Sequence, residues 1–412
     1  MPLRWIPAVA LGRAVRVAAR VRKRGGGSAV PGLVVNRIAP HFLGSVLSSF
    51  PEGLVVVSGS SGKSTTTKML VAVLEAHGKR VFTNPSTANI SQGLTSALLE
   101  RSSLTGRIDA DLAVLEMDEG HGALLSDRFR SRLVLLTNVM TDQIDRFHDS
   151  DKVLGMLRRI AATAEDRVVL NGDDGMLARL TPGVPIRRFG VSRAVLAASP
   201  RGLGYAETTA DRSADGAVVT LVAGRTATVE LGGAEHALHL PARGVHYAVD
   251  AAAALTAAAE LLGDGFDAER AVGAISAMPA VFGRGEVLTV RGVPVEFVLV
   301  QNPASFQLNV DELDPDLDQV FVAMGSDVRD PSYFWPVDAS RIGRALVVSG
   351  SKAEEIALQL LYQGVQVVRI DPDLPAALDH FLALPAPARG IKTIVFTADA
   401  MRRTRSHLGL AQ

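Results

Sequence analysis

The 412-residue sequence contains no cysteine. This absence excludes disulfide bonds, zinc sites with thiolate ligands, iron–sulfur clusters and a cysteine nucleophile on this chain. Any reaction step that requires an activated thiol must therefore be carried out by another polypeptide.

Two further absences narrow the class of protein. Lys plus Arg and Asp plus Glu number 43 each, so the formal net charge is zero and no overall positive field indicates a nucleic-acid partner. No apolar run reaches the roughly 20 residues that a membrane-spanning helix needs. With 47% hydrophobic residues, the composition is that of a globular protein of two or three domains. We expect a cytoplasmic location.

Acidic residues are missing from the first 51 positions, and the first one is Glu52. Eight basic residues lie in the same stretch: Arg4, Arg13, Arg16, Arg20, Arg22, Lys23, Arg24 and Arg37. Apolar residues between the early arginines favour a basic helix that ends at the glycines 25–27. One interpretation is a helix that packs one face on the body and leaves its arginines in solvent. The other is a peripheral contact with the anionic inner face of a membrane.

Short apolar runs alternate with helical segments from Leu54 to about Leu180. Strands are predicted at 54–57, 80–83, 112–115, 133–136 and 167–170, with helices between them that include 63–76 and 153–163. This alternation predicts an α/β fold with a doubly wound parallel sheet whose two faces are covered by helices.

The rest of the chain predicts an insertion and a second domain. Residues 190–243 are rich in Thr, Gly, Val and Ala, which favours a small antiparallel β insertion, and 247–262 is helical. From about 288 the alternation resumes, with strands at 295–300, 319–323, 345–348, 365–370 and 393–397 and helices at 353–362 and 374–384. We predict a basic N-terminal segment at 1–50, a large α/β domain at 51–288 and a smaller Rossmann-like α/β domain at 289–412.

A phosphate-binding loop follows the first strand. Its sequence is Gly59-Ser60-Ser61-Gly62-Lys63-Ser64, a P-loop variant that leads into the helix at 63–76. Glycines let backbone N–H groups turn toward phosphate oxygens, and the positive end of the helix faces the same anion. Lys63 supplies a charge to the outer phosphates, and the Ser64 hydroxyl can coordinate Mg²⁺.

Polar residues at two other strand ends complete a candidate active site. The strand at 112–115 ends in Glu116-Met117-Asp118-Glu119, and Glu116 is the candidate second ligand of Mg²⁺. The strand at 133–136 is followed by Thr137-Asn138 and, further on, by Asp142 and Asp145. A helix N-cap is the structural alternative for Asp118 or Asp142 taken alone.

These motifs resemble the Mur ligase superfamily. The resemblance rests on the phosphate loop, the acidic strand end at Glu116, the Thr137-Asn138 pair, the run Asn171-Gly172-Asp173-Asp174, and Gly283-Arg284. It implies a Mur ligase central domain that uses ATP and Mg²⁺ to convert a carboxylate into an acyl phosphate, which a nitrogen nucleophile then attacks.

Within the superfamily, the sequence is most similar to the MurT family, the ligase subunits of lipid II isoglutaminyl synthase. The similar stretches are 86–93, which contains Asn89, then 116–120, 142–147, 301–304, 327–330 and 350–355. The resemblance implies that Lys63, Glu116 and Asp330 are catalytic. It also implies nucleotide contacts from the following set: Gly59, Ser61, Gly62, Lys63, Ser64, Thr65, Asn89, Asn138, Asp250 and Arg284.

The family resemblance also implies a substrate and a partner. The carboxylate is the D-glutamate α-carboxylate of a lipid-linked peptidoglycan precursor, and ammonia comes from a GatD-like glutamine amidotransferase in a heterodimer. Because such glutaminases use a cysteine nucleophile, a chain without cysteine needs that second subunit. Asp330 would face the partner's active site, whereas its structural alternative is a turn or helix cap before Pro331.

The sequence departs from the family pattern on the substrate side. The four zinc-ribbon cysteines of the family are absent from 190–243. Tyr247 and Asp250 replace two asparagines of a motif near the adenine, and Gln301 replaces a lysine. The departures leave two other hypotheses open: a paralogue that amidates another carboxylate or uses another amine, and a nucleotide-binding scaffold that has lost catalysis.

Overall fold

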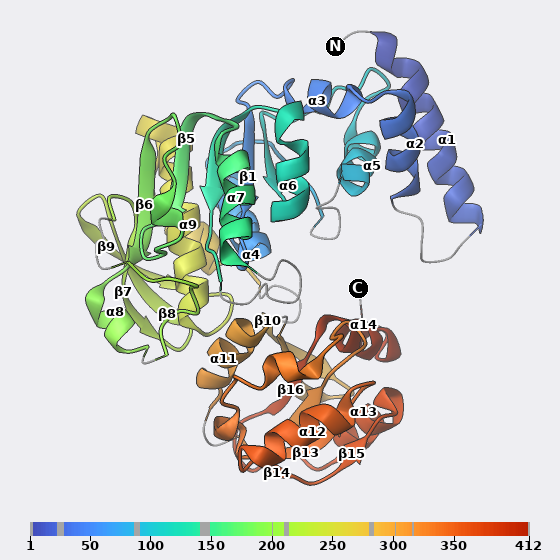
Figure 1. Cartoon of the computed structure of the whole chain (residues 1–412), viewed down its shortest axis with the longest axis vertical. Coiled ribbons are helices and arrows are strands. Elements are labelled where there is room, and N and C mark those ends of the chain that lie inside the picture. The colour runs from blue at the N-terminus through green and yellow to red at the C-terminus, as the bar shows by residue number, and fades with distance from the viewer. Residues whose placement is uncertain are drawn as a thin grey trace.

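Buried runs of Val, Leu and Ala form a nine-stranded sheet in the larger part of the molecule (Figure 1). The structure, a computed structural model, describes residues 3–22, 29–85, 91–140, 149–199, 201–209, 214–279, 284–300, 302–314 and 317–410. The strand order is β2-β3-β1-β4-β5-β6-β7-β8-β9. The strand bounds are β1 Leu54–Ser58, β2 Val81–Thr83, β3 Leu112–Glu116, β4 Ser131–Leu136, β5 Ala164–Asn171, β6 Ile186–Val191, β7 Val218–Ala223, β8 Thr226–Leu231 and β9 Ala234–His239.

The central strands of this sheet are buried on both faces. In β1, Val55 and Val57 point into one hydrophobic cluster, whereas Leu54 and Val56 point into a second cluster on the opposite face. Side chains of a strand alternate between faces, so two covered faces require an unbroken apolar run. The pairs from β2 to β6 are parallel, and the predicted fold class is confirmed.

Helices cover both faces of the nine-stranded sheet, with α4 and α9 on one face and α7 on the other. The helices of this part are α1 Ile6–Arg22, α2 Val30–Ile38, α3 Phe42–Leu47, α4 Lys63–Ala76, α5 Ser91–Arg101, α6 Glu119–Leu125, α7 Ser150–Ala161, α8 Arg193–Ala197, α9 Val245–Leu262 and α10 Ala268–Ser276. Helix α4 has the bounds that the sequence predicts.

The region predicted as a β insertion is continuous with the large sheet. Strand β6 pairs in parallel with β7, and β7, β8 and β9 then pair antiparallel with one another. Alternate residues such as Val219, Ala227 and Val229 are buried in the same cluster as α9. Apolar contacts and strand pairing therefore stabilise this region without cysteine.

The C-terminal part forms a second sheet with the order β10-β11-β16-β12-β13-β14, and β15 also pairs with β13. Within this second sheet the β10–β11 pair is antiparallel, and the other pairs between described strands are parallel. The bounds are β10 Arg284–Val290, β11 Val293–Leu299, α11 Pro303–Asp311, β12 Val320–Ala323, η7 Pro331–Phe334, β13 Arg344–Ser349, α12 Ala353–Tyr362, β14 Gln366–Val367, β15 Ile370–Asp371, α13 Leu374–Ala383, β16 Lys392–Phe396 and α14 Ala398–His407. The three-part division of the chain remains a proposal, and β10, which lies wholly in this sheet, spans the boundary proposed at 288/289.

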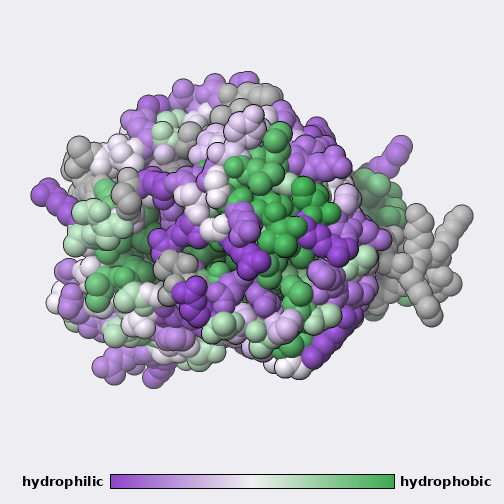
Figure 2. Space-filling view, turned by 90° about the horizontal axis from the view of Figure 1, so that it is seen from below, coloured by the Kyte–Doolittle hydropathy of each residue, from purple (hydrophilic) through white to green (hydrophobic). Residues whose placement is uncertain are grey.

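Exposed apolar side chains are found on the C-terminal domain. Seen from below, hydrophobic residues gather near the middle of the face that this domain presents (Figure 2). Its exposed large apolar side chains, with strand β10 included, are Val287, Trp335, Leu358, Leu361, Tyr362, Val368 and Ile370. The Trp335 and Tyr362 rings lie 5.7 Å apart between centroids.

One described helix is long and apolar enough to span a membrane by composition alone. The segment Val245–Gly265 contains α9, but 78% of its most apolar window is buried inside the protein. Its second turn lies beside the phosphate loop, because a Cβ on Gly62 would overlap the carboxylate of Asp250. We therefore describe α9 as a core helix.

The N-terminal helices pack on α5 through small residues. Gly12 of α1 lies against Leu99 and Val35, and Gly32 of α2 lies against the backbone of Gln92. The backbone N–H of Gly32 donates a 2.8 Å hydrogen bond to the Ser96 hydroxyl of α5. These contacts allow α2 and α5 to approach closely.

We predict that Gly32→Ala destabilises the protein, because the added methyl group would overlap the carbonyl oxygen of Gln92. The expected loss in free energy of unfolding is about 1–3 kcal/mol. Gly155→Ala is the matched control, since a Cβ on this glycine of α7 meets nothing within 4 Å. This control should gain about 0.5–1 kcal/mol in urea denaturation followed by circular dichroism. Equal effects of the two changes would contradict the close approach of α2 and α5.

Candidate functional site

The phosphate loop lies between β1 and α4, at the carboxyl end of the central strand. Gly59 and Gly62 have φ angles of +133° and +80°, which side chains rarely adopt. A Cβ on Gly59 would also overlap the Thr137 hydroxyl. Both glycines are therefore required by the backbone path, which leaves a cradle of the size and polarity that phosphate oxygens need.

Asn138, directly after β4, holds the shape of this loop. Its backbone carbonyl accepts a 2.9 Å hydrogen bond from the Ser60 N–H, and its side-chain oxygen accepts one of 2.9 Å from the Ser61 N–H. The Thr137 hydroxyl donates a 2.6 Å bond to the Ser61 carbonyl. Asn138 was predicted as a nucleotide-binding residue, and here it is bonded to the loop itself.

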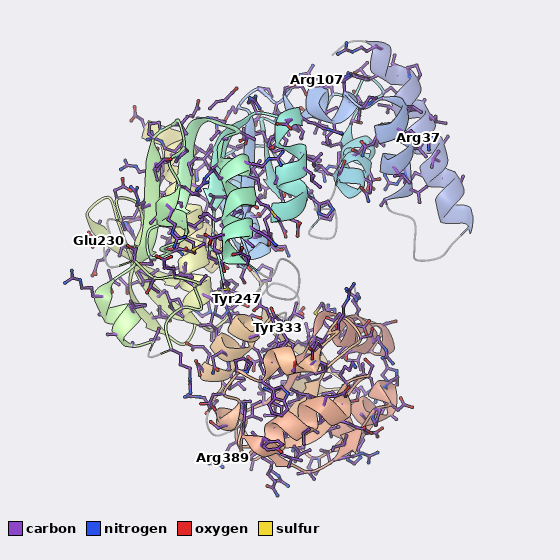
Figure 3. The ribbon with its side chains drawn as sticks, in the orientation of Figure 1. Arg37, Arg107, Glu230, Tyr247, Tyr333 and Arg389 are labelled. Atoms are coloured by element: carbon purple, nitrogen blue, oxygen red, sulfur yellow. The ribbon has the colours of Figure 1, made fainter. Side chains whose placement is uncertain are left out.

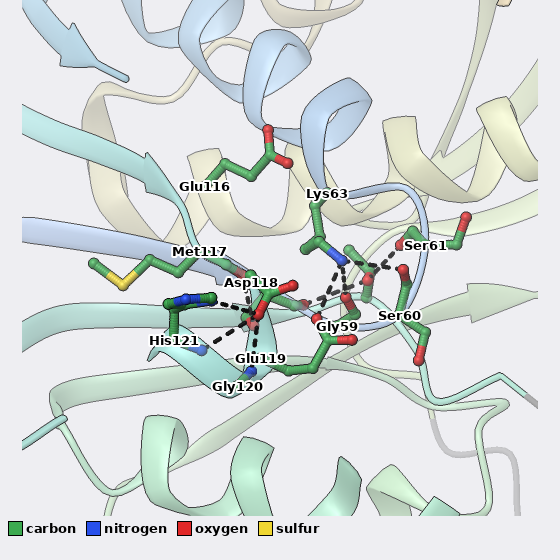
Figure 4. Close-up of polar contacts among 12 residues, drawn as sticks. Gly59, Ser60, Ser61, Lys63, Glu116, Met117, Asp118, Glu119, Gly120 and His121 are labelled. Atoms are coloured by element: carbon green, nitrogen blue, oxygen red, sulfur yellow. Dashed lines mark hydrogen bonds and ion pairs between the residues drawn. The ribbon is translucent and has the colours of Figure 1, made fainter. Parts of the chain in front are cut away.

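Lys63 bends back over the phosphate loop (Figure 4). Its ammonium group donates to the carbonyl oxygens of Gly59 and Ser60, and it lies 3.3 Å from Oε2 of Glu119. Glu119 is fully buried, and its other oxygen has no hydrogen-bond partner among the described residues. The Lys63 charge is therefore held at the site by a buried counter-charge.

Ser64 and Glu116 lie together as predicted for a metal site. The Ser64 hydroxyl donates a 2.7 Å hydrogen bond to Oε2 of Glu116. The backbone of Glu116 is fixed in turn by Asn84, whose amide both accepts from its N–H and donates to its carbonyl at 3.0 Å. Two adjacent oxygen donors suit Mg²⁺, which usually takes one or two protein ligands and completes its shell with water and phosphate. No group of three or more His, Cys, Asp or Glu that could hold a metal occurs among the described residues.

Asp118 is the N-cap of α6. Its carboxylate accepts from the N–H groups of Gly120 and His121 and lies 3.1 Å from the His121 ring. The observed contacts of Asp118 are therefore those of a helix N-cap, the structural alternative to a catalytic role for this residue. Helix α6 begins at Glu119, so this cap also helps to direct Glu119 toward Lys63.

A buried carboxylate on the next strand supports the loop after β4. Asp174 follows β5, accepts a 2.6 Å hydrogen bond from the Val139 N–H, and accepts further bonds from the N–H groups of Met176 and Leu177. Burial raises the pKa of Asp174 to about 6 despite these bonds. Because Val139 adjoins Asn138, Asp174 positions the residue that holds the phosphate loop.

A pocket of about 730 Å³, partly open to solvent, adjoins the loop. Five predicted nucleotide-binding residues line it: Ser61, Gly62, Thr65, Asn138 and Asp250. The other lining residues are Met140, Leu203, Tyr205, Val245, His246, Tyr247, Val249, Leu299, Ser305, Leu308 and Asn309. Figure 3 shows Tyr247 on the side of its domain that faces the C-terminal domain. Apolar and aromatic side chains beside a phosphate cradle form an environment that suits a nucleoside.

Both domains contribute to the surroundings of the pocket. Leu299 and Leu308 come from β11 and α11 of the C-terminal domain. Arg201 of the large domain lies 2.5 Å from Asp311 and also pairs with Asp338. The pocket is therefore closed on one side by the second domain.

Of the remaining residues predicted for the site, the structure describes Asp330 in full, Arg284 only by its backbone and the others not at all. Asp330 is exposed and caps η7 through a 2.9 Å hydrogen bond from the Ser332 N–H, and Ser332 lowers its pKa. The structure gives the backbone of Arg284, at the start of β10, but its side chain is not described. Outside the described residues lie Asn89, Asp142, Asp145 and Gln301. The nucleotide-binding and catalytic roles of the predicted residues remain proposals.

Sequence reasoning missed three residues of the site. Glu119 stands in the quoted acidic motif, but only its contact with Lys63 singles it out. Asp174 stands in the quoted run after β5, and its contact with Val139 is equally invisible in the sequence. Tyr205 had no pattern to indicate it; its hydroxyl accepts a 2.8 Å hydrogen bond from the Asn171 amide, and burial raises its pKa.

Two family descriptions match the chain in succession. The Mur ligase middle domain matches residues 57–258, and the MurT ligase C-terminal region matches residues 299–398. The first match covers the phosphate loop, Glu116, Asn138 and Asp250, and the second covers Asp330.

Curated relatives are similar over less than half of the chain. The lipid II isoglutaminyl synthase (glutamine-hydrolyzing) subunit MurT of Streptococcus pneumoniae is 34% identical over 171 residues, which is 40% of this chain and 36% of that protein. The same subunit of Staphylococcus aureus is 29% identical over 179 residues, 43% of this chain and 39% of that protein. The aligned part thus spans well under half the length of these relatives.

The fold is also that of solved Mur ligases. The MurF ligase of Thermotoga maritima, solved in complex with ADP, superposes with a TM-score of 0.64 at 17% identity, covering 89% of this chain and 81% of that one. The likeness shows that both domains have the Mur ligase arrangement.

We predict that Asp174 makes the stability of the protein depend on pH. The folded protein holds the Asp174 proton more tightly than the unfolded chain, whose pKa is near 3.8. The stabilising contribution of this proton is therefore present below about pH 4 and is lost as the pH rises through about 6. Relative to Asp174→Asn, the wild-type free energy of unfolding should fall by up to about 3 kcal/mol between pH 4 and pH 7.

Urea denaturation at both pH values measures this difference. The control is Asp330→Asn, because the lowered pKa of exposed Asp330 predicts a change in the opposite direction. If the wild type and the Asp174→Asn variant differed equally at both pH values, the raised pKa of Asp174 would be contradicted.

Proposed function

This chain belongs to the Mur ligase superfamily, and from that premise we propose that it is an ATP-dependent carbon–nitrogen ligase that forms an amide. In the proposed reaction, the γ-phosphoryl group of ATP is transferred to a carboxylate to give an acyl phosphate and ADP. Ammonia then attacks the acyl carbon, phosphate leaves, and the amide remains.

The observation that carries this proposal is the constellation at the carboxyl ends of β1, β3 and β4. There the phosphate cradle, Lys63 and the Ser64–Glu116 oxygen pair lie together beside a pocket that the second domain completes. Parallel α/β sheets place ligands at this edge. In a phosphoryl transfer the protein contributes mainly by positioning the reactants and by stabilising the phosphate charge, which this set of groups can do.

Each residue has a proposed role that follows from its position. The N–H groups of the phosphate loop and the Lys63 ammonium would bind phosphate oxygens, and Ser64 and Glu116 would hold Mg²⁺, which neutralises phosphate charge. Glu119 positions Lys63, and Asn138 positions the loop. Asn89 and Arg284 are proposed to contact the nucleotide on the strength of the family motifs alone.

We infer a glutaminase partner from the composition and from the relatives. Two curated relatives are subunits of a glutamine-hydrolyzing synthase, and this chain contains no cysteine to hydrolyse glutamine by the thiol route. Exposed Asp330 is accessible to a second chain and is proposed to act at the partner's active site. The proposed partner is therefore a GatD-like amidotransferase with a cysteine nucleophile, in a heterodimer.

The proposed acceptor is the D-glutamate α-carboxylate of a lipid-linked peptidoglycan precursor. The family resemblance implies this acceptor, and the names of the MurT relatives, which are subunits of a lipid II isoglutaminyl synthase, support it. Such an acceptor places the enzyme in the cytoplasm at the inner face of the membrane.

A second candidate function is the amidation of a different carboxylate. Tyr247 and Asp250 line the pocket where the family carries asparagines, and both are buried. The four cysteines of the family's zinc ribbon are also absent. These changes leave the phosphate loop intact and alter its surroundings, as expected for a paralogue with another acid or amine.

We predict that Lys63→Ala lowers Mg²⁺-dependent, carboxylate-stimulated ATP turnover by about 10²- to 10³-fold, because one preorganised charge is lost from the transferred phosphoryl group. A coupled assay of ADP release measures the rate. The control is Lys152→Ala on α7, an exposed lysine of the same domain. Full turnover by the Lys63→Ala protein would refute the assignment of the loop, and a wild-type protein without any turnover would favour the scaffold hypothesis.

We predict that Asp330→Asn impairs amidation that uses glutamine as the nitrogen donor but not amidation that uses ammonia. Amidation with glutamine as nitrogen donor, in the complex with a cysteine-dependent glutaminase, should fall at least about tenfold, whereas amidation with added ammonia should not change. Mass spectrometry of the products measures both. The control is Glu354→Gln, at an exposed position of α12. Recovery of a single chain that prefers free amino acids as nucleophiles would support the second candidate function instead.

A further inference from the structure

Helix α1 exposes an apolar stripe to solvent. Over residues 6–18, the part of α1 whose side chains the structure describes, the exposed positions follow helical spacing and are apolar: Pro7, Ala10, Leu11, Ala14, Val17 and Ala18. A surface helix of a globular protein normally shows the reverse arrangement, with its polar face in solvent. Scattered apolar residues need no explanation, but a continuous stripe along a helix does.

Arg13 and Arg16, in the middle of α1, do not lie on this apolar stripe. Arg13 donates to the carbonyl oxygen of Ser102, and Arg16 pairs with Glu100. Both acceptors lie at or directly after the end of α5. These contacts fix the rotation of α1 about its axis, so the apolar stripe is held outward rather than buried against the body.

Helix α2 extends the same kind of surface. Its exposed large apolar residues are Val30, Leu33 and Ile38, with exposed fractions of 43%, 62% and 53%. We call the exposed large apolar residues of the two helices, together with exposed Arg4 and Arg37, the hairpin surface: Leu11, Val17, Val30, Leu33, Ile38, Arg4 and Arg37. In Figure 1, α1 forms the outer edge of the molecule, with α2 between it and α5.

The chain segment that carries the hairpin surface has only basic charged residues, and Glu100 of the neighbouring α5 is paired with Arg16. No Asp or Glu occurs before Glu52, and Arg4 and Arg37 are exposed at its margins. Figure 3 shows Arg37 on α2, at the end of the molecule far from Arg389. Apolar side chains flanked by exposed cations match the apolar interior and anionic headgroups of a lipid surface.

We propose that the hairpin surface docks the protein on an anionic lipid bilayer. A symmetric pair of two copies would bring like charges of the same surface together, whereas anionic headgroups would neutralise them. Because one apolar insertion or one basic patch alone gives only marginal attachment, the two together are needed. The inference deepens the proposed function, since an enzyme with a lipid-linked acceptor would meet that acceptor at a bilayer.

Vesicle sedimentation of the full chain tests this proposal. The vesicles contain phosphatidylcholine either alone or mixed with phosphatidylglycerol, and neither ATP nor a substrate is added. The protein is expected to bind the mixed vesicles, to bind phosphatidylcholine alone at least about tenfold more weakly, and to be released by high salt.

Two pairs of variants locate the contact. Leu33→Asp and Arg37→Glu should each weaken binding to the mixed vesicles by about tenfold or more. Their matched controls, Leu361→Asp on α12 and Arg389→Glu, change equally exposed residue types at the other end of the molecule and should bind as the wild type does. Thermal unfolding midpoints of the Leu33, Arg37 and Leu361 variants should equal that of the wild type, because the replaced side chains are exposed. Arg389→Glu loses an ion pair with Asp318, so circular dichroism checks that this control is folded at the temperature of the binding assay.

The proposal is overturned if the wild type does not bind mixed vesicles, or if the two control variants lose binding as strongly as the hairpin variants. It is also overturned if the chain forms a dimer that Leu33→Asp dissociates, since the surface would then be covered by a second copy. ATP turnover with a carboxylate that carries no lipid should be unchanged in Leu33→Asp. Vesicle binding and amidation therefore succeed or fail independently of each other.

Discussion

The geometry of the site depends on the hydrogen bonds that Asn138 accepts from the phosphate loop. A loop that must offer its N–H groups to an anion cannot use all of them in its own secondary structure, and so its shape has to be imposed from outside. Asn138 does this for Ser60 and Ser61, and Asp174 holds Val139 beside it. The carboxyl ends of β1, β4 and β5 are thereby joined, and the path of the loop is fixed before any ligand enters.

Local patterns were sufficient to predict most elements and the centre of the site. Helices α4 and α12 begin and end at the residues expected, because apolar periodicity and the neighbouring glycines act within a few residues. The Ser64–Glu116 contact could also be predicted, since parallel strands end at one edge of a sheet. The rest depends on contacts between distant parts of the chain. Glu119 lies next to Lys63 only because α6 begins at Glu119. The rotation of α1 about its axis is set by the contacts of its Arg13 and Arg16 with the end of α5.

Structural and functional interpretations of one residue need not exclude each other. Asp118 caps α6, and that cap helps to place Glu119 next to Lys63. Asp330 caps η7 and yet remains exposed and ionised, with its pKa lowered by Ser332. The hydrogen bond from the Ser332 N–H orients the Asp330 carboxylate. The same cap can therefore hold this carboxylate in the position where a partner subunit would use it.

The pocket beside the phosphate loop is lined by both domains, by Leu299 and Leu308 from the C-terminal domain and by Tyr247 and Asp250 from the large one. A molecule bound there acts as an additional cross-link between two domains that ion pairs also join, among them those of Arg201 with Asp311 and Asp338 and of Arg243 with Glu296. By thermodynamic linkage, its affinity includes the free energy of holding the domains together. Any change that loosens the domain contact therefore weakens binding, even when no atom that touches the ligand has moved.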